Sequence, residues 1–300
     1  MTDAPILRVQ DLVRTFGGVR AVDGVNLEVR PGQTVAVIGP NGSGKTTLFN
    51  LISGLLRPDG GAIEFQGQRI EGLRPDRIAE LGIARTFQNG RVFGNMTVRE
   101  NVLVGMHTKL RAQRPFGELR RKPLVRWVPL VAEAVVGLFQ PPSARVEEAA
   151  NEAEVDHELS RFGERLLPRR EHFAYSLSYA NRRRTEIARA LALGPKLLLL
   201  DEPTAGMNQT ETAEVLDQLT QLRAEGQTML LIEHKLDLVF TLADHVVVLD
   251  YGKVIAEGLP REVQENERVI EAYLGHNRPS ASLLPLGEGS PQSPLPLGEG

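Results

Sequence analysis

The sequence predicts an α/β protein built around a largely parallel sheet with helices on both of its faces. Three apolar segments carry this prediction: residues 34–38 (TVAVI), 197–201 (LLLLD) and 228–234 (TMLLIEH). Each is interpreted as a strand buried on both faces, because its apolar residues are continuous rather than alternating with polar ones. The first two are followed by stretches with helical periodicity, the order expected of strand–helix–strand units.

Boundary signals and alternation predict the remaining elements. Val25, Leu27 and Val29 alternate with polar residues, as on a half-buried strand. Thr97 with Glu100 and Asn208 with Glu211 have the spacing of capping boxes, which begin helices. The other predicted elements are a strand at 6–16, a hairpin at 245–258, and helices at 45–56, 75–82 (ending at Gly82), 179–191, 209–226 (ending at Gly226) and 267–275.

Composition narrows the class of protein. The 300 residues carry a net charge of −3, which argues against a dedicated nucleic-acid binder, and no nucleic-acid partner is expected. Cysteine is absent, which excludes disulfides and cysteine-based metal sites. The N-terminus lacks the pattern of a signal peptide, and the longest apolar stretch (124–139) is too short to span a bilayer. We therefore expect a cytoplasmic protein whose role at a membrane would need a partner.

Two further regions differ from the rest in composition. Within 104–176, residues 109–126 hold seven basic residues and one acidic residue, whereas 147–158 hold six acidic residues and no Lys or Arg. These blocks are either solvated helix faces or a docking surface near a membrane partner, with the basic block facing anionic headgroups. In residues 276–300, Pro, Gly and Ser make up 13 of the 25 positions, and LPLGEG occurs twice, so we expect a disordered tail.

The strongest motif is GPNGSGKT, in which Gly39 to Thr46 match the pattern G-x-x-x-x-G-K-[ST]. Its glycines let backbone N–H groups surround phosphate oxygens, and the helix that follows adds its positive N-terminus. Lys45 would contact the β- and γ-phosphates of ATP, and the Thr46 hydroxyl would bind Mg²⁺. The predicted nucleotide-binding residues of this P-loop are Gly39, Pro40, Asn41, Gly42, Ser43, Gly44, Lys45, Thr46 and Thr47.

A second motif places two carboxylates after an apolar run. Asp201 and Glu202 follow four leucines, so they lie at the carboxyl end of a predicted strand, where open α/β sheets bind ligands. Asp201 would hold Mg²⁺ directly or through water. Glu202 would act as the general base for the attacking water.

These motifs, in this order, resemble the ATP-binding subunits of ABC transporters over residues 5–275. The resemblance implies one domain at 1–275 with a RecA-like P-loop core, an antiparallel β subdomain and a helical insertion at about 89–190. It implies that Phe16 stacks on adenine, although a core phenylalanine is the alternative. It implies that Gln88 contacts Mg²⁺ or water and senses the membrane partner, and that His234 contacts the γ-phosphate. Residues 204–208 (TAGMN) resemble the D-loop.

Within that family, the chain resembles the branch that serves branched-chain amino acid transporters, through residues 84–105, DEPTAGMN and VIEAYLG. The resemblance implies an ATPase at the cytoplasmic face of the cell membrane, bound to transmembrane permease subunits that receive solute from a periplasmic or surface solute-binding protein. Import of urea or short amides is the alternative cargo. Two further functions fit the same motifs: a soluble ABC ATPase outside transport, and a regulatory subunit without useful hydrolysis.

The family's signature, Leu-Ser-Gly-Gly-Gln, corresponds here to Leu177-Ser178-Tyr179-Ala180-Asn181. The resemblance implies a second ATP-binding subunit, identical or different, paired head to tail, with Ser178 acting on the partner's ATP. Ala180 adds a Cβ where the family has glycine. We consider two hypotheses: this signature weakens the partner's site and makes an asymmetric pair, or a slight backbone shift accommodates Ala180.

Overall fold

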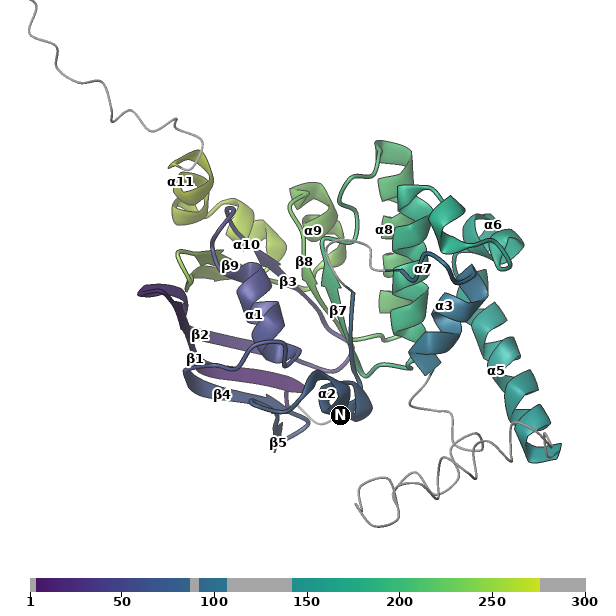
Figure 1. Cartoon of the computed structure of the whole chain (residues 1–300). Helices are drawn as coiled ribbons and strands as arrows, with labels where there is room; N and C mark the ends of the chain where they lie inside the picture. Colours follow the sequence, from purple (N-terminus) through teal and green to yellow (C-terminus); the bar gives the residue numbers. More distant parts are fainter. Residues whose placement is uncertain (1–3, 87–91, 107–141, 276–300) are drawn as a thin grey trace, which may run out of the picture.

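The computed structural model describes residues 4–86, 92–106 and 142–275, and within them it contains two β-sheets flanked by helices (Figure 1). The larger sheet has six strands in the order β10-β9-β3-β8-β7-β6, and all neighbouring strands are parallel except β9 and β10. The predicted mostly parallel sheet is therefore confirmed. Its strands are β3 (Thr34–Ile38), β6 (Ile83–Arg85), β7 (Leu197–Asp201), β8 (Met229–Ile232), β9 (His245–Asp250) and β10 (Lys253–Gly258).

The smaller sheet is antiparallel and has the order β2-β1-β4-β5. Val25, Leu27 and Val29 point into the core while the residues between them are exposed, as their alternation predicts. The strands of this sheet are β1 (Leu7–Phe16), β2 (Val19–Val29), β4 (Gly60–Phe65) and β5 (Gln68–Arg69).

The apolar residues of the larger sheet divide between two cores because successive side chains of a strand point to opposite faces. Val35 and Val37 of β3 pack with α1 (Lys45–Ile52) and the smaller sheet. Ala36 and Ile38 pack with the helices on the other face. All five residues of β3 are buried, as the continuous apolar run predicts. The glycine loop at 39–46 thus follows a strand that packs against an apolar core on each of its two faces.

Helices cover the second face and extend away from it. The structure confirms the predicted capping boxes at Thr97 and Asn208. It also confirms that a helix ends at Gly82. Four helices, α3, α5, α6 and α7, pack together beside the sheet (Figure 1). Besides α1, the helices of the described residues are α2 (Pro75–Leu81), α3 (Val98–Gly105), α5 (Pro142–Ser160), α6 (Gly163–Leu166), α7 (Tyr179–Ala192), α8 (Gln209–Ala224), α9 (Leu236–Leu242), α10 (Pro260–Gln264) and α11 (Glu267–Gly275), with short 3₁₀ turns at Leu167–Arg169 and Ala174–Ser176.

Two predicted boundaries are wrong. The first helix ends at Ile52 rather than at residue 56, because Gly54 adopts φ +73°, a conformation that ends a helix. The backbone of Gly54 also lies close to the next segment, since a Cβ on this residue would be 2.7 Å from the Leu73 carbonyl oxygen. The third apolar strand ends at Ile232, so His234 lies two residues beyond it.

The acidic block lies on α5, where parts of it pair within the chain. Glu152 pairs with Arg99, and Asp156 pairs with Arg170. This pairing favours the interpretation of a solvated helix face for that block. The basic block up to residue 126, the tail at 276–300 and Gln88 lie outside the described residues. None of the described helices is long and apolar enough to cross a membrane.

Candidate functional site

The glycine loop lies between β3 and α1, where two of its glycines allow backbone segments to touch. A Cβ on Gly39 would overlap the carbonyl oxygen of Leu249 and lie 2.8 Å from Oγ of Ser43. A Cβ on Gly44 would overlap the carbonyl oxygen of Ala21. Both glycines have positive φ, at +147° and +106°. The neighbouring strands therefore hold the loop closely at both of its ends.

Lys45 begins α1, and its ammonium group lies inside the loop. Nζ donates hydrogen bonds to the carbonyl oxygens of Gly39 and Pro40, both at 2.8 Å, and only 5% of the residue is exposed. Burial lowers the pKa of Lys45, while the nearby carboxylates of Glu202 and Asp201 raise it. The loop thus holds a desolvated cation at the position where the motif requires one, and an entering phosphate would provide it with a closer opposite charge.

A cavity of about 280 Å³ opens beside the loop. It brings together groups that lie far apart in the sequence: the glycine loop, the end of β7 and the segment after β8. Its lining residues are Ala21, Asn41, Gly42, Gly44, Lys45, Thr46, Thr47, Glu202 and His234.

Asp201 ends β7, and its carboxylate is almost completely buried. Oδ2 accepts a hydrogen bond of 3.0 Å from Nη2 of Arg85. Burial raises the pKa of Asp201, and Arg85 counteracts this rise. Oδ1 is buried and has no hydrogen-bond partner within the described parts of the chain. A carboxylate oxygen without a hydrogen-bond partner fits the oxygen donors that Mg²⁺ prefers, and Thr46, an exposed residue on the cavity wall, has a hydroxyl of the same donor class.

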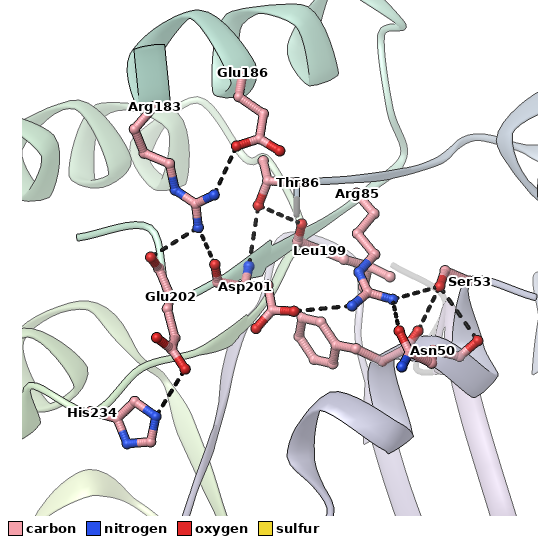
Figure 2. Close-up of polar contacts among 11 residues, drawn as sticks. Asn50, Ser53, Arg85, Thr86, Arg183, Glu186, Leu199, Asp201, Glu202 and His234 are labelled. Carbon is pink, nitrogen blue, oxygen red and sulfur yellow. Dashed lines mark hydrogen bonds and ion pairs between the residues drawn. The ribbon is translucent and has the colours of Figure 1, made fainter. Parts of the chain in front are cut away.

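Glu202 follows Asp201 and points toward His234 (Figure 2). Its Oε1 lies 3.0 Å from Nε2 of His234, and its backbone N–H donates to the Ile232 carbonyl oxygen at 2.9 Å. The backbone of Glu202 has φ +50°, in the left-handed region that non-glycine residues rarely adopt. Such a conformation is often found at functional sites, where the surroundings stabilise it.

Sequence reasoning did not assign roles to several residues that support this site. Arg85 donates to Asn50 and Ser53 as well as to Asp201, and so joins α1 to the end of β7 (Figure 2). The buried carboxylate of Glu233 accepts hydrogen bonds from the backbone N–H groups of Thr204 and His234. A charged residue next to a buried apolar strand was the signal in each case.

Two other predicted site residues, Phe16 and Ser178, are described but do not line this cavity, and Gln88 lies outside the described residues. Phe16 ends β1 and is 43% exposed, so the alternative of a core phenylalanine is wrong; the Arg14 guanidinium lies 4.8 Å from its ring centroid. The described chain before Gln88 ends at Thr86, which is anchored to β7. The Thr86 N–H donates to the Leu199 carbonyl oxygen, and the Thr86 hydroxyl accepts from the Asp201 N–H.

Ser178 caps α7, as predicted, and its Oγ accepts a hydrogen bond from the Asn181 N–H at 3.3 Å. Ser178 is exposed and does not line the cavity beside this chain's own loop. Ala180 is only 2% exposed and packs into the apolar core that α7 shares with the sheet. Its methyl group therefore points into its own subunit, which argues against a steric obstacle on the outer surface and favours accommodation of Ala180.

Comparisons with known proteins agree with this geometry. The ABC transporter family profile matches residues 22–205, and the profile described as branched-chain amino acid ATP-binding cassette transporter matches residues 253–278. The chain is 40% identical over 272 residues to the high-affinity branched-chain amino acid transport ATP-binding protein BraF of Pseudomonas aeruginosa, which covers 90% of this chain and 98% of that protein. It is 39% identical to the protein LivG, of the same description, of Escherichia coli, with the same coverage.

A solved ATP-binding cassette of an ABC transporter, in its ADP conformation, has the same fold. It superposes with a TM-score of 0.72 at 32% identity, over 91% of this chain and 99% of that one. Fold, motif geometry and sequence similarity agree, and the family binds nucleotides and hydrolyses ATP. The chain therefore belongs to the ABC transporter family, in the branch that contains the ATP-binding proteins of branched-chain amino acid transport.

Proposed function

We propose that this chain binds ATP with Mg²⁺ and hydrolyses it to power the import of branched-chain amino acids through a membrane transporter. The observation that carries the proposal is the pairing of Glu202 with His234 at 3.0 Å, on the wall of the cavity that also contains Lys45 and Thr46. A base, a cation and a magnesium ligand around one cavity are the parts that phosphoryl transfer to water needs.

The phosphates of ATP would lie in the glycine loop at the N-terminus of α1. The loop's N–H groups and Lys45 would bind the β- and γ-phosphates, and the exposed ring of Phe16 would stack on adenine. Thr46, Asp201 and Gln88 would hold Mg²⁺, which neutralises charge on the phosphate oxygens when bound. The buried Oδ1 of Asp201, which accepts no hydrogen bond from the described residues, supports this assignment.

In the hydrolytic step, Glu202 would accept a proton from water as the water oxygen bonds to the γ-phosphorus. The bond from that phosphorus to the oxygen bridging the β- and γ-phosphates breaks, and its electron pair stays on ADP. Positioned proton transfer of this kind contributes about 10²–10⁴ in rate. His234 would orient Glu202 through its 3.0 Å contact and contact the γ-phosphate through its second ring nitrogen.

Assembly would supply what one chain lacks. A second ATP-binding subunit, identical or different, would pair head to tail and present its own signature to this loop, and Ser178 at the N-terminus of α7 would serve the partner's ATP. The pair of ATP-binding subunits would bind to permease subunits at the cytoplasmic face of the membrane. The permease subunits would receive solute from a periplasmic or surface solute-binding protein.

An apolar cavity of about 470 Å³ supports the proposal of a permease contact. It lies between the ends of α1, α3 and α7 and beside α2, and Arg85, which pairs with Asp201, is on its wall. A permease helix in this cavity would therefore touch Arg85, whose guanidinium pairs with the proposed magnesium ligand Asp201. Its lining includes Leu55, Ile78, Ile83, Phe93, Val104 and Leu193.

The test is uptake of labelled leucine, with urea in parallel, by cells that carry the wild-type chain or Glu202→Gln and lack other routes for each solute. Glu257→Gln, an exposed change on β10, is the matched control and should leave uptake unchanged. We expect loss of leucine uptake alone in Glu202→Gln. Loss of urea uptake alone would change the cargo, and persistence of both without ATP hydrolysis would refute the transport role.

A further inference from the structure

The helix that begins with the signature, α7, touches the segment 201–206 of the same chain at two places. The first is Arg183, which is 1% exposed at its side chain. Its Nη2 donates to the carbonyl oxygens of Asp201 and Glu202, the latter at 2.9 Å, and its Nη1 donates to Oε2 of Glu186 at 2.7 Å (Figure 2). A helix residue thus holds the backbone on both sides of the bond between Asp201 and Glu202.

This contact matters for Glu202 because of the conformation of that residue. Its φ of +50° lies in a region that costs a non-glycine residue free energy. A charged donor to its carbonyl oxygen is stronger than a neutral one and compensates for part of that cost. With the backbone in this conformation, Oε1 of Glu202 lies 3.0 Å from Nε2 of His234.

The second contact joins Tyr179, the first residue of α7, to Gly206. A Cβ on Gly206 would lie 3.1 Å from Cε1 of Tyr179, and Gly206 has φ +72°. The ring therefore lies directly against the backbone of Gly206, where a larger residue would push it away. Tyr179 adjoins Ser178, whose hydroxyl caps the same helix. The exposed N-terminus of α7 and the loop after Glu202 are thus packed together.

We propose that Arg183 and Tyr179 are positioning residues that join the N-terminal turns of α7 to the segment 201–206 and so hold Glu202 in its active conformation. The inference rests on the proposed function. Because Ser178 at the tip of this helix would contact a partner's ATP, movement of α7 upon that contact would be transmitted to this chain's own Glu202. The two nucleotide sites of the pair would then be coupled through residues within one subunit.

The variants are chosen so that the protein still folds. Arg183→Met with Glu186→Leu removes both charges together, since a single change would leave a buried charge unpaired. Tyr179→Ala removes the second contact, and Tyr179→Phe keeps the ring. The matched control is Glu158→Leu with Arg161→Met, which removes another i,i+3 pair, with Nε and Oε2 3.0 Å apart, away from the cavity.

Two measurements on the full chain test the proposal. Hydrogen–deuterium exchange of residues 201–207 without nucleotide should accelerate about tenfold in the Arg183/Glu186 and Tyr179→Ala variants, which reports local opening. In steady-state ATP hydrolysis, kcat should fall about 10²-fold, as expected of a catalytic group displaced by about 1 Å. KM for ATP should stay within about threefold, because the glycine loop is untouched. Tyr179→Phe and the control pair should match wild type in both.

The outcomes separate this inference from the proposed function. Unchanged exchange, unchanged kcat despite faster exchange, or an equal loss in the control pair would each overturn the positioning role. A wild-type complex that never hydrolyses ATP would refute the proposed function instead. In that case the exchange measurement still decides whether α7 holds the segment 201–206.

Discussion

The guanidinium of Arg85 and the carboxylate of Asp201 form an ion pair of 3.0 Å whose side chains are only 7% and 1% exposed. The residues lie 116 positions apart and join the end of β6 to the end of β7. Burial raises the pKa of Asp201, and the pairing with Arg85 counteracts part of that rise. This relationship leads to a prediction about stability and pH.

Arg85→Met should lower the free energy of unfolding at pH 7 by about 3–5 kcal/mol, because it leaves a buried carboxylate without its partner. In this variant the pKa of Asp201 rises further above its usual value of 3.8. The folded state then binds more protons than the unfolded state, so stability is highest below that value and falls as pH rises through the native pKa. Urea unfolding between pH 4 and 8, with about 0.5-unit steps, measures this slope.

The control for Arg85 is the double variant Arg85→Met, Asp201→Asn. Removing the carboxylate should abolish the additional pH dependence and restore part of the stability. If the single and double variants show the same pH dependence of unfolding, the Asp201 carboxyl does not titrate as the structure indicates.

Glu202→Gln should reduce kcat for ATP hydrolysis by about 10²–10⁴-fold, because the amide cannot accept the proton of the attacking water. Binding of ATP should persist, since the loop and Lys45 are unchanged. Equilibrium binding of a fluorescent ATP analogue, measured beside steady-state turnover, checks both. Loss of binding together with turnover would mean that Glu202 supports the loop rather than the chemistry.

Ala180→Gly should not raise ATP turnover of the assembled pair and should destabilise the chain by about 0.5–1 kcal/mol, the ordinary cost of glycine in a helix. The reason is the burial of the Ala180 methyl group in its own core, at 2% exposure. Thermal unfolding and turnover of the assembled pair provide the two readings. A clear increase in turnover would favour the asymmetric pair instead.

Gly39→Ala should lose nucleotide binding and stability, because the added methyl group would overlap the Leu249 carbonyl oxygen in addition to straining φ. Gly42→Ala is the matched comparison: it has φ +80° but no atom within 4 Å of the added Cβ, so it meets backbone strain alone. Urea midpoints and nucleotide titrations should rank Gly39→Ala well below Gly42→Ala. Equal effects would show that the close approach at Gly39 is unimportant.

Phe16→Ala should weaken ATP binding by about 1–3 kcal/mol, the range for loss of one stacked base, and leave the stability of the chain nearly unchanged. The ring is 43% exposed at the end of β1, so little core packing is lost. Val19→Ala, at the position paired with Phe16 on β2, is the control. Titration with ATP and with inorganic triphosphate separates stacking from phosphate binding. Phe16→Ala should weaken the affinity for ATP and leave the affinity for triphosphate unchanged, because triphosphate has no base to stack.

The sequence alone was sufficient for features that depend on neighbouring residues. The glycine loop is a run of consecutive residues, and its chemistry follows from φ freedom and one lysine. The buried strands were evident because a continuous apolar run is expected where a strand is covered by other elements on both faces of its sheet. The caps at Thr97, Asn208 and Ser178 require partners only three residues away. The adjacent carboxylates Asp201 and Glu202 could likewise be placed at a strand end.

The tertiary structure decided which residues support and orient those groups. Arg85, Arg183 and Glu233 act on atoms that lie 18 to 116 positions away along the chain. Whether Ala180 points inward and Phe16 outward depends on how whole elements pack, and no local pattern contains that information. Local motifs are determined by short-range sterics and hydrogen bonds, whereas buried charge pairs depend on which segments the folded core brings together.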